Sequence, residues 1–290
     1  MRLGIKLDLG FSDDVIYRQL FGKRDILGYL VELGVQTVET AITPETEERV
    51  LLTHTRRCCE AGLRLSLHPY TEGTRFNPTY FSKAGDNPSR DTHEQFLNLA
   101  SEIASIQGEE VIVNLHSAAA SKDVARWRLV YKSVRLFEWA QEMCVCHTSG
   151  ARVVAELQYS PDPEERIQRI GDNFGELLFI CTRSGVDACW DFGHAYMNWH
   201  RYGLAAKPPE AYWKNVTHVH CHDVFLGDHF PLIYHRVPWG EYLSGLFKCG
   251  FNGAVIIEVP PECFIIAGGL ETVQKSVEEL LALPEMRNAD

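Results

Sequence analysis

Long hydrophobic runs are missing from this chain of 290 residues. None approaches the roughly 18 apolar residues that a helix needs to cross a bilayer. The opening segment, MRLGIKLDLG, also lacks the longer apolar core of a secretory signal. We therefore expect a cytoplasmic protein with no membrane partner.

Cysteine pairs of the CxxC type are absent as well. The nine cysteines are an odd number and lie scattered along the chain. This pattern is typical of reduced thiols that pack as small hydrophobic side chains. The segment Cys144-Val-Cys146-His147 could form half of a soft-metal site, but no second half accompanies it.

Positive charge is scarce. The chain has 28 Lys and Arg against 39 Asp and Glu, which gives a net charge of −11. Nucleic-acid binding depends on clustered cations that neutralise phosphates, so this balance argues against a nucleic-acid partner. A locally basic groove or bound cations would offset the average. No GxGxxG follows the first apolar run, and we expect no nucleotide cofactor.

Eight short apolar runs recur along the chain, with helical spacing between them. Near-continuous apolar runs are typical of parallel strands that are covered on both faces. The expected strands span residues 2–8, 36–42, 63–69, 110–116, 152–158, 186–192, 216–222 and 254–259. The expected helices span residues 44–61, 91–107, 121–147, 163–183, 239–249 and 269–283.

Turn residues punctuate this alternation. Thr43 followed by Pro44 predicts an N-cap and a first helical position. A glycine separates a predicted helix from the next strand at five places: Gly62, Gly108, Gly150, Gly185 and Gly250. Each of these glycines is expected to end its helix.

Eight βα units without a linker predict one domain over residues 1–290, a single (β/α)₈ TIM barrel. The alternative is a doubly wound open sheet. Three βα connections, at 70–88, 195–208 and 223–238, are long and rich in aromatic or basic residues. Such connections build the active site at the C-terminal ends of barrel strands.

Polar residues end the last four predicted strands. These residues are Glu156, Asp191 with His194, His220, and Glu258. A carboxylate near the end of a buried strand is costly unless it is paired or binds a metal. A helix cap or a buried arginine would explain any one of them alone. Four matching strand ends instead predict a divalent metal at the mouth of the barrel.

Three histidines alternate with apolar residues on the seventh strand. Period 2 places His218, His220 and His222 on one face. Of the three, His220 lies at the level along the strand that best suits a ligand at the barrel mouth. His218 lies deeper in the barrel and is more easily explained as a core residue. His222 and Asp223 could support the ligands from the loop entrance.

His68 and His116 end the third and fourth strands in the parallel segments LSLHP and VNLHS. Either histidine alone would be an ordinary core or loop residue. Together they could hold an additional zinc ion.

These motifs resemble the xylose isomerase-like TIM barrels. The shared order is a glutamate, Asp-x-x-His, His-x-His and a second glutamate on strands five to eight. That group includes ketose 3-epimerases, hydroxypyruvate isomerase, inosose dehydratase, sugar-phosphate isomerases and epimerases, and AP endonuclease family 2, the endonuclease IV class. The resemblance covers essentially the whole chain.

The epimerase pattern implies that Glu156, Asp191, His220 and Glu258 bind one divalent metal, Zn, Mn, Co or Mg. It further implies that Glu156 and Glu258 are catalytic and exchange the substrate proton, and that His194 binds the substrate. A metal that bridges two adjacent sugar oxygens acidifies the C–H between them and stabilises an enediolate.

The endonuclease IV pattern implies more ligands, for three zinc ions. Its counterparts here are His68, His116, Glu156, Asp191, His194, His220, His235 and Glu258. An aspartate expected two residues before His235 is replaced by Ile233, which tilts the balance towards one metal. Glu39 resembles the sugar-isomerase members, where a glutamate on the second strand is common.

The expected function is therefore a metal-dependent isomerase or epimerase of a sugar, sugar phosphate or related polyol. The alternatives are an endonuclease IV-like zinc phosphodiesterase acting on abasic DNA, a dehydratase of a polyol or keto acid, and a barrel that binds without catalysis. Arg236 is a candidate substrate-binding residue. The expected partner is a small carbohydrate, and a homo-oligomer is compatible with the sequence.

Overall fold

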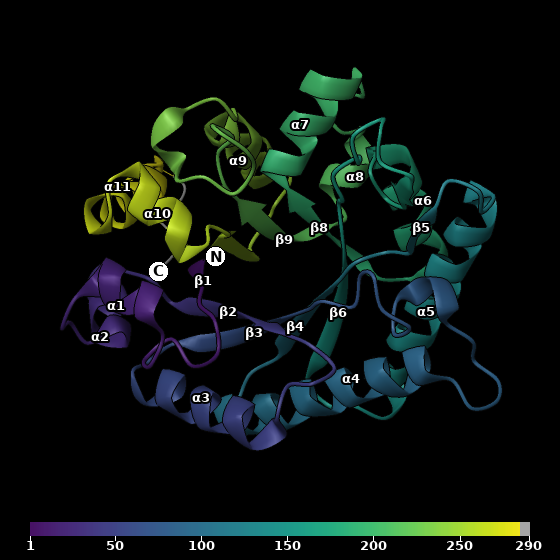
Figure 1. Ribbon diagram of the computed structural model, residues 1–290, viewed down its shortest axis with the longest axis horizontal. Coiled ribbons are helices and arrows are strands. Elements are labelled where there is room, and N and C mark those ends of the chain that lie inside the picture. The colour runs from purple at the N-terminus through teal and green to yellow at the C-terminus, as the bar shows by residue number, and fades with distance from the viewer. Residues whose placement is uncertain (285–290) are drawn as a thin grey trace.

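Eight parallel strands close into a barrel in the computed structural model, which describes residues 1–284 (Figure 1). The strands, in their order around the barrel, are β1 (Arg2–Lys6), β10 (Ala254–Ile257), β9 (Val216–Cys221), β8 (Asp187–Asp191), β6 (Ala151–Glu156), β4 (Val111–Leu115), β3 (Arg64–Pro69) and β2 (Thr37–Ile42). Every expected strand is present, and the (β/α)₈ prediction is confirmed.

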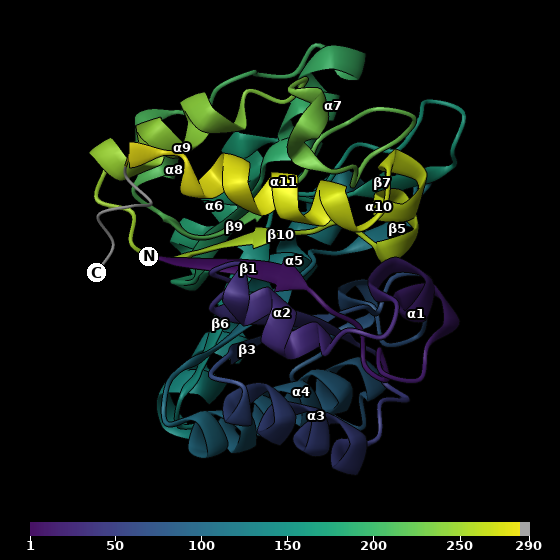
Figure 2. The same ribbon diagram turned by 90° about the vertical axis from the view of Figure 1, so that its left-hand side faces the viewer.

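The first and last strands complete the closure. Ile5 of β1 pairs with Ile257 of β10 on one side and Val38 of β2 on the other. Figure 2 shows β1 beside β10. These apolar residues are buried, as are most residues of the strands. Closure leaves no open edge. Because all eight strands run parallel, their carboxyl ends face one mouth.

Helices surround the strands (Figure 1). Those before β8 are α1 (Val15–Phe21), α2 (Ile26–Glu32), α3 (Glu48–Glu60), α4 (Pro88–Gln107), α5 (Arg126–Cys146) and α6 (Phe174–Ser184). Those after it are α7 (Phe192–Tyr202), α8 (Glu210–Trp213), α9 (Trp239–Lys248), α10 (Pro261–Ala267) and α11 (Leu270–Leu281). Short 3₁₀ turns lie at Pro78–Tyr80 and Leu232–Tyr234. No described helix has the length and apolarity to cross a membrane.

Two helix boundaries differ from the expectation. Thr43 does not cap a helix, because its N–H donates to the Thr46 hydroxyl at 2.9 Å in a separate turn and α3 begins only at Glu48. The predicted helix 163–183 begins at Phe174, where Asn173 caps it. By contrast, Gly108 and Gly185 end α4 and α6 in the left-handed conformation, as expected.

The residues before Phe174 form a strand that local periodicity did not reveal. β7 (Ile167–Arg169) pairs antiparallel with β5 (Ala119–Ser121), which occupies the start of the predicted helix 121–147. This small ribbon joins the connections that follow β4 and β6. The connection expected at 195–208 also differs, since α7 occupies most of it.

Candidate metal centre

Four strand-end residues converge at the mouth of the barrel. Glu156 and Asp191 are the last residues of β6 and β8. His220 lies one residue before the end of β9, and Glu258 follows β10 directly. Nδ1 of His220 is 2.7 Å from Glu258, 3.6 Å from Glu156 and 3.8 Å from Asp191. Ligand atoms of Glu156, Asp191 and His220 lie within 4.8 Å of one another, and Glu258 joins this group through its contact with His220. These are the four residues that the resemblance implied as ligands of one metal.

Buried atoms without hydrogen-bond partners surround this point. Among the described residues, Nδ1 of His220, Oε2 of Glu258 and Oε1 of Glu156 are inaccessible and form no hydrogen bond. Leaving such an atom unpaired costs about 1–3 kcal/mol, and a cation bound near each atom would offset that cost. Imidazole nitrogen and carboxylate oxygen are donors that suit Zn²⁺ and Mn²⁺. The residues present therefore fit a divalent metal.

Positive charge holds the two glutamates in the ionised form that a metal requires. Burial would raise the pKa of Glu156, but His116 lowers it well below its ordinary value. Burial likewise opposes ionisation of Glu258, and His220 with Lys6 lowers its pKa well below the ordinary value.

Glu39 lies beneath the cluster and orients His220. Its Oε1 is 2.6 Å from Nε2 of His220, while its Oε2 accepts hydrogen bonds from His218 at 2.8 Å and Ser66 at 3.0 Å. With Nε2 directed at Glu39, His220 presents Nδ1 to the cluster. A carboxylate behind a ligating histidine fixes the ring and raises its basicity. His218 occupies the lower layer, as the sequence predicted.

The two oxygens of Glu258 face different groups. Oε1 accepts hydrogen bonds from Tyr70 at 3.1 Å and Lys6 at 3.3 Å. Oε2 faces His220. This division leaves one oxygen for a metal and ties the other to a cationic wall of the mouth.

A second group shares Glu156 with the first. Nε2 of His68 lies 2.9 Å from Nε2 of His116, and these nitrogens are 3.3 Å and 3.4 Å from the Glu156 carboxylate. Ligand atoms of the three residues lie within 4.8 Å of one another. This geometry fits the additional cation that the two histidines were expected to hold.

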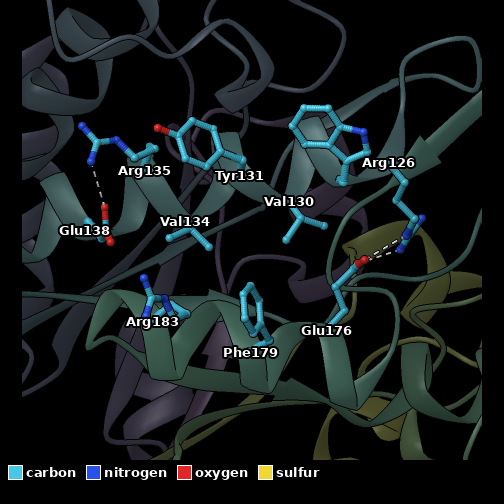
Figure 3. A pocket seen from close by; sticks show the side chains of 10 residues that line it. Arg126, Val130, Tyr131, Val134, Arg135, Glu138, Glu176, Phe179 and Arg183 are labelled. Atoms are coloured by element: carbon cyan, nitrogen blue, oxygen red, sulfur yellow. Dashed lines mark hydrogen bonds and ion pairs between the residues drawn. The ribbon is translucent and has the colours of Figure 1, made fainter.

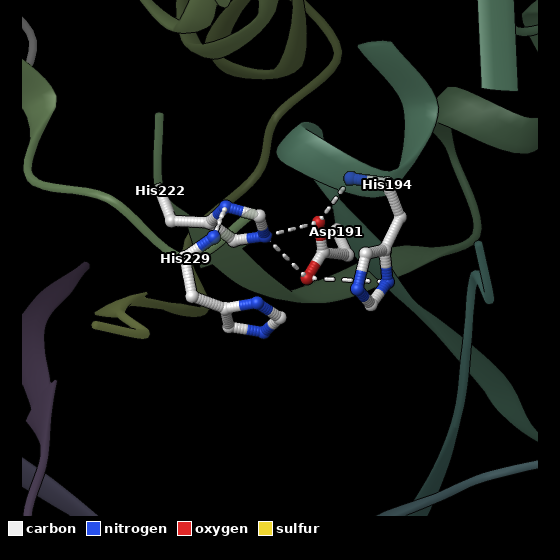
Figure 4. A group of neighbouring side chains, drawn as sticks. All are labelled: Asp191, His194, His222 and His229. Atoms are coloured by element: carbon white, nitrogen blue, oxygen red, sulfur yellow. Dashed lines mark hydrogen bonds and ion pairs between the residues drawn. The ribbon is translucent and has the colours of Figure 1, made fainter. Parts of the chain in front are cut away.

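A third group shares Asp191. Its members are Asp191, His194, His222 and His229, with ligand atoms within 4.8 Å of one another. Figure 4 shows the Asp191 carboxylate between His194 and His222, at 3.4 Å and 3.1 Å respectively. Asp191 and Glu156 are therefore carboxylates that two ions could share.

The protonation of His194 follows from its surroundings. Its Nδ1 lies 3.0 Å from the Leu157 carbonyl, which can only accept, so Nδ1 carries the proton. Burial lowers the pKa of His194, which keeps the ring neutral. Its Nε2 is buried, forms no hydrogen bond with any described residue, and is free to bind a metal or accept from a hydroxyl.

The structure does not bring His235 or Arg236 to this cluster. His235 is 56% exposed and lies 3.7 Å from Glu279, and the Arg236 guanidinium covers the Phe225 ring. The reason is the path of the loop, because the Asp223 carboxylate accepts hydrogen bonds from the backbone N–H of residues 236 and 237. Residue 235 consequently turns outward.

His229 takes the place that the sequence argument gave to His235. It adopts a left-handed backbone with φ 54°, and its Nε2 lies 3.4 Å from Glu258. Burial opposes its charge, but Glu258 and Asp228 raise the pKa of His229 to about 10. The acidic residue directly before it, Asp228, is the one sequence feature that could have identified His229 as a site residue. The periodic pattern of the seventh strand ends before this loop.

A pocket of about 450 Å³ opens above the cluster. The lining residues are Lys6, His68, Tyr70, Glu72, His116, Glu156, Gln158, Tyr159, His194, Asp228, His229, Glu258, Pro260 and Cys263. Arg169 of β7 holds one side of the rim, since it lies 2.7 Å from Glu72 and its guanidinium stacks 4.1 Å from the Tyr159 ring. All four candidate ligands are buried, and of these only Glu156 and Glu258 belong to the lining of the pocket.

The closed parallel barrel and the cluster at its mouth define a (β/α)₈ barrel with a candidate metal centre. The chain belongs to the xylose isomerase-like TIM barrel family, whose model matches residues 27–283. No curated protein matches the sequence.

Solved structures of similar fold include sugar epimerases and an endonuclease-family member. D-psicose 3-epimerase from Clostridium cellulolyticum H10 superposes with a TM-score of 0.64 over 100% of this chain and 99% of its own, at 13% identity. The IOLI protein, solved with zinc bound, gives 0.60 over 98% of both chains at 13% identity. An AP endonuclease family 2 protein from Brucella melitensis gives 0.58 over 88% and 92% at 14% identity. At these identities the likeness concerns the fold.

Proposed function

We propose that this protein is a divalent-metal-dependent isomerase or epimerase of a sugar, sugar phosphate or related polyol. One observation carries the proposal. Glu156 and Glu258 both approach Nδ1 of His220 and both line the pocket, whereas the remaining candidate ligands Asp191 and His220 do not line it. Two carboxylates can therefore touch a substrate and share in holding a cation.

Proton transfer falls to these two glutamates. Bound to the cluster, a divalent cation would polarise adjacent oxygens of the substrate and acidify the C–H between them. One ionised glutamate removes that proton as general base to give an enediolate, and the other returns to the carbon a proton that it takes up from solvent. Neutral His194 accepts a hydrogen bond from a substrate hydroxyl through its free Nε2.

The pocket suits a small polar substrate. Its volume of about 450 Å³ lies at the lower end of the range for small-molecule sites, roughly 300–1,000 Å³. The lining also includes Lys6 and Tyr70, which can donate hydrogen bonds to hydroxyl or phosphate oxygens. The sugar specificity of D-psicose 3-epimerase, a protein of the same fold, supports this class.

Solvent exchange tests the proposal. The metal-loaded protein is incubated in D₂O with a panel of ketoses, aldoses and their phosphates, and deuterium at carbon is followed by NMR. We expect at least one sugar to exchange, and Glu156→Gln and Glu258→Gln each to reduce the exchange by about 100-fold or more. Exchange retained in both variants would remove the glutamates from the mechanism.

Glu262→Gln is the matched control. Glu262 lies in α10, four residues after Glu258, and is exposed outside the pocket. The same carboxylate-to-amide change at this position should leave exchange unaltered. A loss there equal to that of Glu258→Gln would point to a general effect on the fold.

A second candidate is a zinc-dependent phosphoester hydrolase. The observation that favours it is the chain of three ligand groups, in which Glu156 and Asp191 are shared between neighbours. Paired metal ions about 3.5–4 Å apart serve phosphoester cleavage by holding both the attacking and the leaving oxygen. The excess of acidic residues counts against a DNA substrate.

Metal content and a nicking assay separate the two candidates. One metal per chain with sugar exchange supports the isomerase. Two or three zinc ions per chain with cleavage of abasic duplex DNA, lost in Glu258→Gln, would support the hydrolase and overturn our first proposal.

A further inference from the structure

A groove of about 620 Å³ lies on the outside of the barrel, away from the mouth, between α5 and α6. Figure 3 shows its two walls, with Tyr131 on α5 and Phe179 on α6 facing each other near the middle. Val130 and Val134 form the apolar floor. The groove contains none of the candidate metal ligands and is a separate feature of the molecule.

Aromatic side chains are concentrated here. Of six exposed aromatic residues in the described chain, Trp127, Tyr131 and Phe179 lie on this groove with exposures of 66%, 57% and 52%. Three half-exposed aromatic side chains present on the order of 300 Å² of surface. A patch of that size marks an interaction site more often than plain solvent-exposed surface does.

Charge is distributed unevenly along the groove. At one end, Glu176 pairs with Arg126 at 2.7 Å. At the other end, Arg135 pairs with Glu138 at 3.4 Å, whereas Arg183 makes no ion pair with any described residue. Each end therefore contains a paired carboxylate, and the end with Arg135 and Arg183 carries an excess of positive charge.

These features repeat about a common centre. On α5, Trp127 and Arg135 each lie four residues from Tyr131 on one stripe of the helix. On α6, Glu176 and Arg183 lie three and four residues from Phe179.

A two-fold axis crossing the groove through both central rings would set each helix antiparallel to its symmetry mate. Trp127 would then face Arg135 of the other copy, a cation–π pair. Glu176 would face Arg183 of the other copy, an ion pair.

We propose that the α5/α6 groove is a self-complementary interface that takes a second copy of this chain. The same patch on both copies is what a two-fold dimer requires. Each pairing would occur twice, and each of the two central aromatic residues would meet its own symmetry mate at the axis. Such an arrangement leaves the barrel mouths open.

Analytical ultracentrifugation of the metal-loaded protein tests the interface. We expect a concentration-dependent dimer, and Phe179→Asp and Tyr131→Asp each to weaken dimerisation by at least ~30-fold, as for a central interface residue. Both side chains are more than half exposed, so thermal melting and metal content should not change. Val145→Asp, at an exposed position on the same helix, is the matched control.

A disulfide reports the register. In a background lacking the exposed Cys146 and Cys249, Tyr131→Cys should form a covalent dimer under oxidised glutathione, because it lies on the axis. Cys146 is fifteen residues further along α5, so it would lie roughly 45 Å from its mate and should not crosslink. A monomer at all concentrations, an undiminished dimer in both aspartate variants, or a Tyr131→Cys protein that fails to crosslink would each overturn the proposal. A persistent monomer would leave the groove to a different protein.

Discussion

His229 stacks flat against His222, with ring centroids 4.1 Å apart and planes 9° from parallel. The backbone N–H of His229 also donates to Nδ1 of His222 at 2.9 Å. The other ring nitrogen of His222, Nε2, lies 3.1 Å from the Asp191 carboxylate. The loop after β9 is thereby connected to a candidate ligand at the end of β8.

Replacing His229 should therefore impair the site. We predict that His229→Ala lowers kcat/KM by about tenfold or more, because the ring supports His222 and its charge keeps the pKa of Glu258 low. Steady-state kinetics on the sugar that exchanges, together with metal content, measures this effect. His235→Ala is the matched control, since that side chain is exposed beside Glu279. Equal losses in the two variants would contradict the assignment.

Glu39 offers a second test, because it touches His220 from below and does not line the pocket. We predict that Glu39→Gln weakens metal binding about 10–100-fold, as the ring loses the carboxylate that orients it. Competition with a chromogenic chelator measures the affinity. Glu109→Gln provides the comparison, since Glu109 pairs with Arg64 at the opposite end of the barrel. Unchanged affinity in Glu39→Gln would mean that His220 is oriented by other contacts.

Gly193 lies where the His222 ring approaches the backbone of α7. A Cβ at this position would come within 2.0 Å of the imidazole, so even a methyl group must displace the ring. We predict that Gly193→Ala lowers the free energy of unfolding by about 1–3 kcal/mol and weakens metal binding through Asp191. Urea denaturation and metal titration test both effects. Gly240→Ala, in α9 with its nearest neighbour at 3.9 Å, should be neutral or stabilising.

The strand-end ligands could be predicted because a buried strand fixes both the direction of each side chain and its level along the barrel axis. Once VVAELQ and VIIEV are recognised as parallel strands, Glu156 and Glu258 must lie at the same mouth. Period 2 likewise separated His220 from the lower-layer His218. These inferences need only local sequence and barrel closure.

The positions of loop residues do not follow from strand periodicity or barrel closure. The position of His229 depends on the bridge between Asp223 and Phe230 and on a left-handed backbone, neither of which has a periodic signature. β7 was taken for a helix because its partner β5 lies far away in the sequence. Gly193 lies within α7 and is required by the close approach of His222, a contact that no periodic pattern in the sequence indicates.

Two histidines far from the metal centre should make stability depend on pH. His54 is buried. The Thr40 hydroxyl donates its proton to a backbone carbonyl, so its oxygen accepts a hydrogen bond from Nε2 of His54 at 3.0 Å. His93 is buried and donates from Nδ1 to the Ser89 carbonyl at 2.7 Å. Burial lowers the pKa of both imidazoles to about 4. Both are therefore neutral in the folded protein at pH 5, while the unfolded chain is protonated there.

Acid should consequently destabilise the protein through these residues. Below pH 6.5 each of these histidines is protonated in the unfolded chain, whereas in the folded protein it becomes protonated only near pH 4. The free energy of unfolding therefore falls as the pH drops through this window. When the pH is lowered from 6.5 to 5, each histidine should reduce the free energy of unfolding by on the order of 2 kcal/mol. Urea denaturation at the two pH values should show a smaller loss in His54→Gln and His93→Gln than in the wild type. His200→Gln, at an exposed position, should retain the full loss, and an equally full loss in the two buried variants would show that neither histidine is responsible.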